Sequence, residues 1–464
     1  MSFTEKFAAT YKKLLPTPFT IAILLTLLTF ILALIFTKPN DTATGAYILD
    51  LAGFWENGLW NDGKGGLYFA FQMMLMLVLG HIIALSKPIS LVIDSLLRPC
   101  TNTANTAFIV TFATILVSLF NWGLGLIFGA ILARKVGEKF SRENKPLNYP
   151  LIGAAAYVGL MVWHGGISGS APIKAAEEGN LKNLVENVPR IDLAALPNQV
   201  GMNETIFSTM NITVTILLLI CVPLFIFWIG KRSFKFDKLP EPIVAVEAEE
   251  QNHEGAEKLD HSSIFSWIIG GVILLYAFYK AAILPEELSL KFLNPNFINF
   301  TLLGAAILVH RNISKFLEAA GAAISGATGI LLQFPLYFGI LGLMVGSGLI
   351  GQISDAFVAF SSPDSFPIFS FFSAGLVNVF VPSGGGQWAV QGPIIIASAQ
   401  ELGVSYPKAI MALSYGDQLT NMIQPFWALP LLGITGLKAK DILPYTLLLF
   451  LAGGAIFLLG LALF

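Results

Sequence analysis

Long apolar runs, separated by short polar segments, repeat along almost the whole chain. A helix needs about 20 apolar residues to cross the roughly 30 Å hydrocarbon core of a bilayer, and most of these runs reach that length. The pattern therefore predicts an all-α, polytopic integral membrane protein. The full-length runs lie at 17–37, 66–86, 149–172, 208–230, 263–284, 324–350, 407–432 and 442–463, and a shorter run lies at 297–310.

Two apolar stretches, 107–136 and 366–402, are each nearly long enough for two crossings and carry a break in the middle. Each could form two spans or a re-entrant hairpin that returns to its own side. Lys and Arg concentrate in cytoplasmic loops; they flank 107–136 on both sides, whereas 351–365 contains none. We therefore predict a hairpin entered from the cytoplasm at 107–136 and one entered from outside at 366–402. With the N-terminus inside, the basic residues behind this orientation are Lys6, Lys12, Lys13, Lys87, Arg98, Arg134, Lys135, Lys139, Arg142 and Lys145.

A shift of 257 residues (407 − 150) overlays the first half of the chain on the second. It pairs Tyr149 with Tyr406 and Asn121 with Asn378. It also superimposes the polar break in the span 149–172 on the polar break in the span 407–432. We predict two inverted-topology repeats, each with a re-entrant helical hairpin and a broken transmembrane helix. The predicted domains are a cytoplasmic N-terminal segment (1–16), a first repeat (17–230, broken helix 149–172), a polar cytoplasmic linker (231–262), and a linker helix with the second repeat (263–464, broken helix 407–432).

The breaks themselves are rich in glycine and short polar side chains. Irregular backbone persists at membrane depth only where it lines a protein cavity, and paired breaks in two halves point to the substrate site of a secondary transporter. Helix N-termini suit a carboxylate, and glycine lets backbone approach a ligand closely. The candidate substrate contacts are Asn121, Trp122, Gly123, Gly125, His164, Gly165, Gly166, Ser168, Ser383, Gly384, Gly385, Gly386, Gln387, Asn421 and Gln424.

Asp417 is the clearest acidic residue within an apolar span, and His164 is the ionisable residue of the first repeat's break. Charges at the bilayer centre are costly and usually functional, although a carboxylate that only holds the broken helix is an alternative. No Lys or Arg lies deep in either break, so a monoanionic substrate is favoured. We expect no cofactor and no certain metal, only H⁺ or Na⁺ as a coupling ion, with Asp417, Asn121, Ser168 and Asn421 as candidate contacts.

Four tryptophans also lie at the breaks, at positions 122, 163, 388 and 427. Their large apolar rings predict a wall for a short alkyl chain, and helix packing is the competing interpretation.

Composition agrees with membrane embedding and excludes other classes. The chain of 464 residues is 55% hydrophobic and 12% charged, whereas soluble domains carry about 25% charged residues. A net charge of −2 gives no reason to expect a nucleic-acid partner. The two cysteines, Cys100 and Cys221, do not have the spacing of a metal site.

The sequence resembles the bacterial short-chain fatty acid transporter family, the type associated with acetoacetate and butyrate uptake. The matching segments are FNWGLGLIFGAILAR (120–134), YVGLMVWHGGISGSAP (157–172), VPSGGGQWAVQGP (381–393) and SYGDQLTNMIQPFWALP (414–430). The resemblance implies a short-chain monocarboxylate carrier of the cytoplasmic membrane within the wider ion-transporter superfamily. It also implies elevator-type movement and a homodimer.

Two other functions compete with a cation-coupled carrier. A passive channel or an exchanger for small anions would need no coupling ion. An intramembrane serine hydrolase is suggested by the Gly-x-Ser-Gly pattern at 166–169, with Ser168 as nucleophile, and it would need a histidine placed against that serine.

Overall fold

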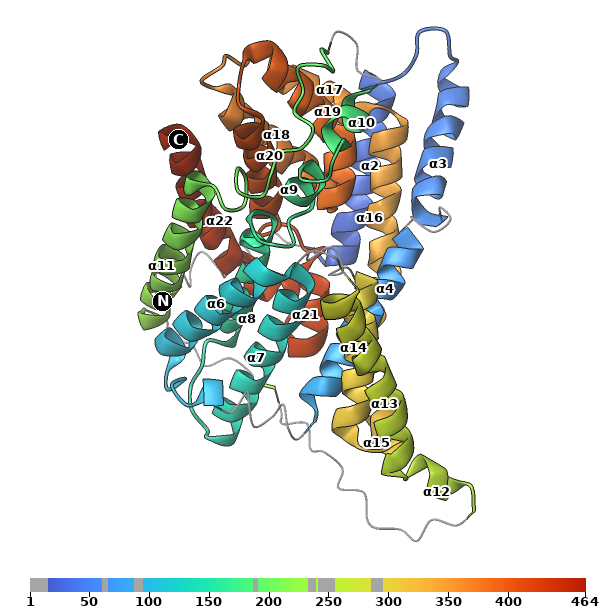
Figure 1. Ribbon diagram of the computed structural model, residues 1–464, viewed down its shortest axis with the longest axis vertical. Helices are drawn as coiled ribbons and strands as arrows, with labels where there is room; N and C mark the ends of the chain where they lie inside the picture. The colour runs from blue at the N-terminus through green and yellow to red at the C-terminus, as the bar shows by residue number, and fades with distance from the viewer. Residues whose placement is uncertain are drawn as a thin grey trace.

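The computed structural model describes residues 16–60, 66–86, 95–186, 191–232, 239–240, 255–284 and 295–464. All regular elements within these ranges are helices (Figure 1). Seven of these helices are long and apolar enough to cross a membrane, and one further pair passes the same test as a bent span. The prediction of an all-α, polytopic membrane protein is confirmed.

Among the described residues, eleven α-helices lie outside the hairpins, the broken spans and the loop after the first broken span, and two short elements, the π-helix η3 (Tyr279–Ile283) and the 3₁₀ turn η4 (Ile324–Ala327), lie there too. The α-helices are α2 (Pro18–Phe36), α3 (Thr44–Trp60), α4 (Gly66–Ala84), α11 (Thr209–Lys231), α12 (Glu257–Asp260), α13 (Ser263–Phe278), α14 (Pro295–His310), α15 (Ile313–Ala323), α16 (Thr328–Gly346), α17 (Leu349–Ala359) and α22 (Ala439–Leu463). The bent span joins α14 to α15 at 120°, with Arg311 in the left-handed region at φ 67° between them.

The helix α3 was not among the predicted elements. Its sequence contains Asp50 and Glu56, so its hydropathy falls below that of the other runs. It packs along α16, where small residues bring the two backbones together: a Cβ at Gly58 would lie against the carbonyl of Phe338 and the Cα of Gly342. Helix packing through glycine is typical of membrane interiors, and hydropathy alone does not report it.

Two helical hairpins are present, as predicted; the first extends beyond its predicted bounds at both ends, and the second coincides with its predicted bounds. The first is α6 (Thr103–Phe120) with α7 (Trp122–Arg142), and the second is α18 (Phe366–Phe380) with α19 (Gly384–Leu402). Asn121 and Ser383 cap the second helix of each hairpin, because their side-chain oxygens accept the amide N–H three residues later. Such caps satisfy backbone donors that a helix start leaves open.

The two broken helices also lie where the sequence predicts them. The first consists of α8 (Tyr149–Tyr157), the 3₁₀ turns η1 (Val158–Met161) and η2 (Trp163–Gly165), and α9 (Ser170–Ala175); α10 (Asn180–Val185) follows. The second consists of α20 (Tyr406–Thr420) and α21 (Ala428–Thr435). Both begin with Tyr-Pro, which places proline at a first-turn position where its missing N–H costs nothing.

The repeat is visible in the contacts between hairpins and broken helices. A Cβ at Gly159 would collide with Ser118, and a Cβ at Gly416 would collide with Phe371 and Gly375. The same 257-residue shift relates Gly159 to Gly416 and Ser118 to Gly375. Figure 1 shows α6, α7 and α8 toward one end of the molecule and α18, α19 and α20 toward the other, as expected for opposite orientations. Domain boundaries stay a prediction, and residues 1–15, Lys87 and most of the 231–262 linker lie outside the described residues.

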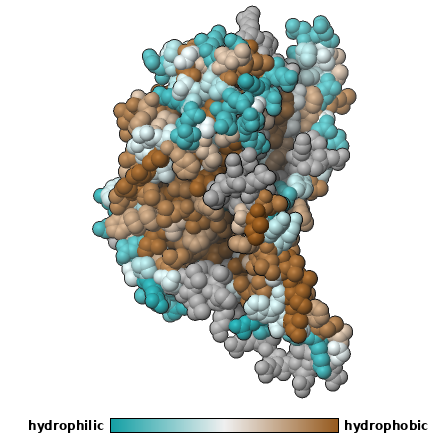
Figure 2. All heavy atoms as spheres, viewed as in Figure 1, coloured by the Kyte–Doolittle hydropathy of each residue, from teal (hydrophilic) through white to brown (hydrophobic). Residues whose placement is uncertain are grey.

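The outer surface carries apolar faces suited to lipid. Figure 2 shows a large hydrophobic area on the side formed by α11 and α22. On α11 the side chains of Ile212, Ile216, Ile220 and Leu224 are 42% to 52% exposed. Their four-residue spacing places them along one face of the helix. This face and the seven apolar helices indicate a multi-pass membrane protein.

Candidate functional site

A buried contact between two side chains joins the broken helices at their breaks. His164 Nδ1 lies 2.5 Å from Asp417 Oδ2, and the two side chains are 0% and 1% exposed. A second contact mirrors it: Asn421 Nδ2 donates to the carbonyl of Leu160 at 3.3 Å. The shift of 257 residues turns Leu160 into Asp417 and His164 into Asn421. The repeats therefore cross in a self-complementary way, as an internal two-fold relation requires.

The protonation of His164 follows from its other nitrogen. The backbone N–H of Ala171 donates to His164 Nε2 at 2.9 Å, so Nε2 carries no proton and Nδ1 carries the proton of the neutral ring. Nδ1–H then donates to Asp417 Oδ2. The second oxygen, Asp417 Oδ1, is buried and has no hydrogen-bond partner among the described residues. Asp417 Oδ1 is therefore the oxygen of this carboxyl group that the described residues leave without a hydrogen bond.

Further polar groups fix the unwound backbone around His164. Gln418 Oε1 accepts the amide N–H groups of His164 (2.8 Å) and Gly165 (3.0 Å). Asn211 on α11 donates to the carbonyl of Gly165 at 2.9 Å and accepts the hydroxyl of Tyr415 at 2.9 Å. These side chains replace the helical hydrogen bonds that the break gives up.

The tip of the first hairpin is fastened to the first break. Trp122 N–H donates to Ser168 Oγ at 3.0 Å, and Ile167 N–H donates to the carbonyl of Leu119 at 2.7 Å. Asn121 is buried and uses its side-chain oxygen to cap α7 through Leu124 N–H at 2.9 Å. Gly166 also lies here, because a Cβ on it would lie against the Leu119 backbone.

The tip of the second hairpin reaches the same place from the other side. A Cβ at Gly384 would lie 2.6 Å from Trp163 Cη2 and 2.9 Å from His164 Cε1. Ser383 Oγ accepts Gly386 N–H at 3.2 Å, which caps α19. Gln387 is fully buried; its side-chain Nε2 donates to the carbonyl of Ala374, and its side-chain Oε1 has no partner among the described residues. The tips of both hairpins therefore meet the first break.

Asn378 organises the second break and was not among the predicted contacts. Its Nδ2 has three acceptors within 3.0 Å: the carbonyl of Asp417, Thr420 Oγ1 and Asn421 Oδ1. Gln424 Nε2 in turn donates to the Asn378 carbonyl at 3.0 Å. The sequence signal for Asn378 is its pairing with Asn121 in the repeat.

Some of the predicted substrate contacts do not face the point where the two broken helices meet at His164 and Asp417. A Cβ at Gly123 would approach Met76 Sδ at 2.9 Å, and Gly125 lies against Ser118 inside its own hairpin. Both glycines therefore hold close helix contacts. Among the described residues, the one atom within 4 Å of a Cβ on Gly385 would be Ser170 Oγ, at 4.0 Å.

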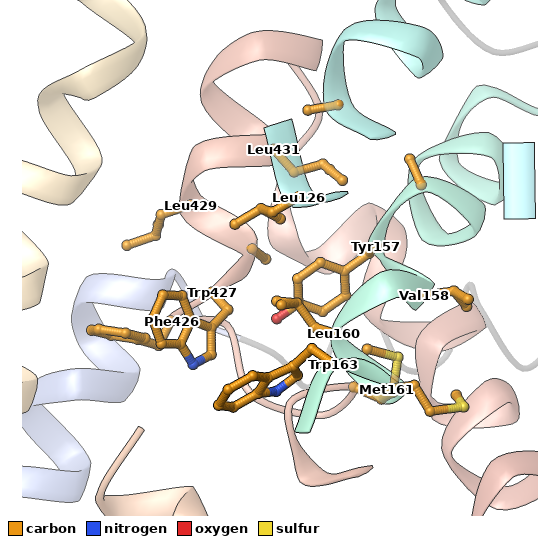
Figure 3. Close-up of a cluster of buried hydrophobic side chains, with 14 of the residues drawn as sticks. Leu126, Tyr157, Val158, Leu160, Met161, Trp163, Phe426, Trp427, Leu429 and Leu431 are labelled. Atoms are coloured by element: carbon orange, nitrogen blue, oxygen red, sulfur yellow. The ribbon is translucent and has the colours of Figure 1, made fainter. Parts of the chain in front are cut away.

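Three of the four tryptophans form an aromatic cluster beside His164. Trp163 stacks on His164 with centroids 4.4 Å apart, and Trp122 contacts both Trp163 (6.1 Å) and Trp427 (5.0 Å). Figure 3 shows Trp163 and Trp427 together with Phe426, Tyr157 and neighbouring aliphatic side chains. Trp388 lies elsewhere, in the cluster of α9, α10, α19 and α20, and donates to Asn180 at 3.4 Å. Three of the four rings that were predicted to form a wall therefore lie together, and the fourth does not.

The geometry argues against a serine nucleophile. Ser168 Oγ accepts a backbone N–H, and both ring nitrogens of His164 are engaged, with Asp417 and with Ala171. A base that activates a serine must have a nitrogen free to accept the hydroxyl proton. His164 has none in this arrangement.

Two adjacent glycines test the contact of the second hairpin tip. Gly384→Ala should reduce transport strongly, because its Cβ would press on Trp163 and His164, whereas Gly385→Ala should stay close to wild type. Uptake in proteoliposomes at equal protein content measures the difference. Equal activity of the two variants would show that the tip does not stay against His164 during transport.

Comparison with known proteins gives the family. Residues 2–464 match the family described as short chain fatty acid transporter. A relative from Escherichia coli (strain K12), named as a candidate short-chain fatty acid transporter, is 36% identical over 459 residues, covering 97% of this chain and 96% of its own. A relative of the same name from Haemophilus influenzae is 34% identical over 473 residues, covering 99% of both chains.

Two solved transporter structures align over nearly the full length. The Alcanivorax borkumensis YdaH transporter has a TM-score of 0.45 at 18% identity and covers 96% of this chain and 97% of its own. Neisseria gonorrhoeae MtrF has a TM-score of 0.42 at 16% identity, with 97% of both chains covered. On the match along the whole chain and these two close relatives, the protein is a membrane transporter rather than an enzyme and belongs to the short-chain fatty acid transporter family.

Proposed function

We propose that this protein carries short-chain monocarboxylates, such as butyrate or acetoacetate, across the cytoplasmic membrane in symport with H⁺ or Na⁺. The observation that carries the proposal is the buried His164–Asp417 pair at the meeting point of two hairpins and two broken helices. The relatives' names supply the substrate class. The coupling follows from the charge of the pair.

A small monoanion suits the groups around this point. Among the described residues, no Lys or Arg side chain is buried, so a substrate with several charges would lack counter-ions. The N-termini of α7 and α19 lie at the hairpin tips, and helix N-termini carry partial positive charge that suits a carboxylate. The rings of Trp122, Trp163 and Trp427 would contact a short alkyl chain.

Asp417 gives the physical reason for a coupling ion. With His164 neutral, an ionised Asp417 leaves one negative charge in the protein interior, and a second anion beside it would be repelled strongly at low dielectric. A proton or a sodium ion on Asp417 Oδ1 would remove that charge and let the substrate bind. Substrate and cation would then be carried together, which is the definition of symport.

We further propose an elevator-type alternating-access movement in a homodimer, as the family resemblance implies. Figure 1 supports a division into two groups: the hairpins and broken helices on one side, and α2, α3, α4, α13, α14, α15 and α16 on the other. The first group would carry the site past the second. Of the competing functions, an exchanger shares the alternating movement and a channel does not.

Butyrate flux in proteoliposomes tests the proposal directly. Counterflow and gradient-driven uptake would be measured with an imposed Na⁺ gradient and, separately, an imposed H⁺ gradient. Accumulation with one gradient is expected and names the ion. Counterflow without accumulation would indicate a facilitator or an exchanger, and flux without counterflow would indicate a channel. Absence of both signals would mean that butyrate is not a substrate.

A further inference from the structure

A cavity of about 440 Å³ opens at the base of the first hairpin, at the end opposite its tip. It is lined by Leu97, Arg98, Lys139, Arg142 and Glu143. Leu97 and Arg98 precede α6, and the other three residues lie at the C-terminal end of α7. Three basic side chains therefore share the cavity with one carboxylate.

The acidic residue of the cavity is already neutralised by a residue outside it. Lys145 Nζ lies 2.7 Å from Glu143 Oε2, whereas Lys139 is 4.0 Å from its other oxygen. The hydrogen bond from Lys145 holds the pKa of the Glu143 carboxyl below its usual value, so this pair persists at neutral pH. Glu143 therefore does not balance the three positive charges of the cavity, which belong to Arg98, Lys139 and Arg142.

The three cations are presented to the cavity in two ways. Lys139 is fixed, because its ammonium donates to the carbonyls of Leu97 (2.7 Å) and Cys100 (3.1 Å). The side chains of Arg98 and Arg142 are exposed, and neither side chain makes a hydrogen bond or an ion pair with another residue in the described ranges. Two free guanidinium groups beside one fixed ammonium form a strong anion-binding set, since guanidinium binds phosphate oxygens in pairs.

The position of the cavity points to the edge of the bilayer. Its residues flank the ends of α6 and α7, and the end of α11 lies alongside, where Gly230 packs on Ala104. At that end, the Arg232 guanidinium lies 3.9 Å from the Trp228 ring centroid, and tryptophan with basic residues is typical of the membrane–water interface. Farther along α6, toward the tip of the hairpin, an apolar surface formed by Phe112, Leu116 and Phe120 is exposed.

We propose that this cavity binds the phosphate headgroup of an anionic phospholipid, with Arg98 and Arg142 on the phosphate and the acyl chains along the exposed face of α6. Free phosphate shares the headgroup's chemistry but would make no contact with the apolar face farther along α6. Basic pockets at the cytoplasmic ends of membrane helices are suited to such lipids. The proposal is independent of which substrate the protein carries.

Lipid titration of the purified full-length protein tests the site. Phosphatidylglycerol and phosphatidylcholine would be titrated separately, and bound lipid counted by native mass spectrometry. The pocket variant is Arg98→Gln/Arg142→Gln, and the matched control is Lys315→Gln/Lys440→Gln, which removes the same charge from exposed positions elsewhere. At about 1 kcal/mol per basic residue, the pocket variant should bind phosphatidylglycerol roughly 30-fold more weakly than wild type, with binding of phosphatidylcholine unchanged.

Two results would overturn the assignment. Equal phosphatidylglycerol affinity in the pocket variant and the control would show that the cavity is not the site. Displacement of phosphatidylglycerol from wild type by millimolar inorganic phosphate, or by butyrate, would show a site for soluble anions instead of lipid. If the double variant is not monodisperse, Arg98→Gln alone keeps the comparison, because Arg98 lies outside the helices.

Discussion

Replacing Asp417 with asparagine is expected to abolish gradient-driven butyrate accumulation while leaving butyrate counterflow. The carboxamide cannot take up a proton and carries no charge to attract sodium. The substitution therefore removes the carboxylate whose negative charge the coupling ion would neutralise. The carboxamide can still accept the Nδ1–H of His164, so the junction between the broken helices keeps its hydrogen bond. Substrate would then bind and exchange without its cation, because the buried negative charge that excludes it is gone.

The measurement compares accumulation under the driving gradient with counterflow at equal concentrations of reconstituted protein. Asp364→Asn is the matched control, because Asp364 is exposed and its substitution removes the same charge. A size-exclusion profile like that of wild type would show that the variant is folded. Unchanged accumulation in Asp417→Asn would make Asp417 a structural carboxylate, and loss of both accumulation and counterflow in folded protein would place it in substrate binding.

The features of this architecture that could be predicted are those determined by residues close together in the sequence. The hairpins and the breaks follow from local sequence, because polar and glycine-rich residues cannot continue an apolar span without a reason. Asn121 and Ser383 lie at helix starts that capping rules identify. Hydropathy failed for α3, since Asp50 and Glu56 lower its apolar character while Gly58 and Gly342 provide the packing that stabilises it.

The contacts of the site depend on partners that are distant in sequence. His164 and Asp417 could be named separately, but their pairing needs the crossing of two broken helices. The match between Asn121 and Asn378 indicated the repeat, but it did not indicate that the two asparagines lie at different places in their hairpins. Asn121 is the turn residue of its hairpin, whereas Asn378 lies in the last turn of α18, before the turn at 381–383. The second hairpin turns later, which frees Asn378 to bind the second break.

Packing also separated Trp388 from the other tryptophans. Its position after the glycines of the second hairpin suggested the substrate wall, but it lies one turn into α19, where a Cβ on Gly392 would press on its ring. A helix turns through about 100° per residue, so residues a few positions apart face different neighbours. The direction of a side chain at a helix start requires the tertiary structure.

The helix crossings that position the site should be very sensitive to a single methyl group. Gly416→Ala is expected to destabilise the protein severely, because its Cβ would collide with the Phe371 carbonyl and the Gly375 backbone. Overpacking a core usually costs about 1–3 kcal/mol, and a collision with the backbone of α18 leaves no side chain that can move away. Gly271→Ala is the control, since nothing lies within 4 Å of a Cβ there, and in a helix alanine is favoured over glycine by roughly 0.5–1 kcal/mol.

The repeat supplies a rescue experiment that distinguishes crowding from other effects. A Cβ at Gly159 would collide chiefly with the side chain of Ser118, and the residue equivalent to Ser118 in the second repeat is Gly375. Gly159→Ala should therefore lower the unfolding midpoint, and adding Ser118→Gly should recover part of the loss by reproducing the small-residue crossing of the second repeat. No single side-chain change should rescue Gly416→Ala, because its obstacle is backbone. A Gly416→Ala protein as stable as Gly271→Ala would show that the broken helix is not held this close to its hairpin, and the tight crossing would then not be what positions Asp417 against His164.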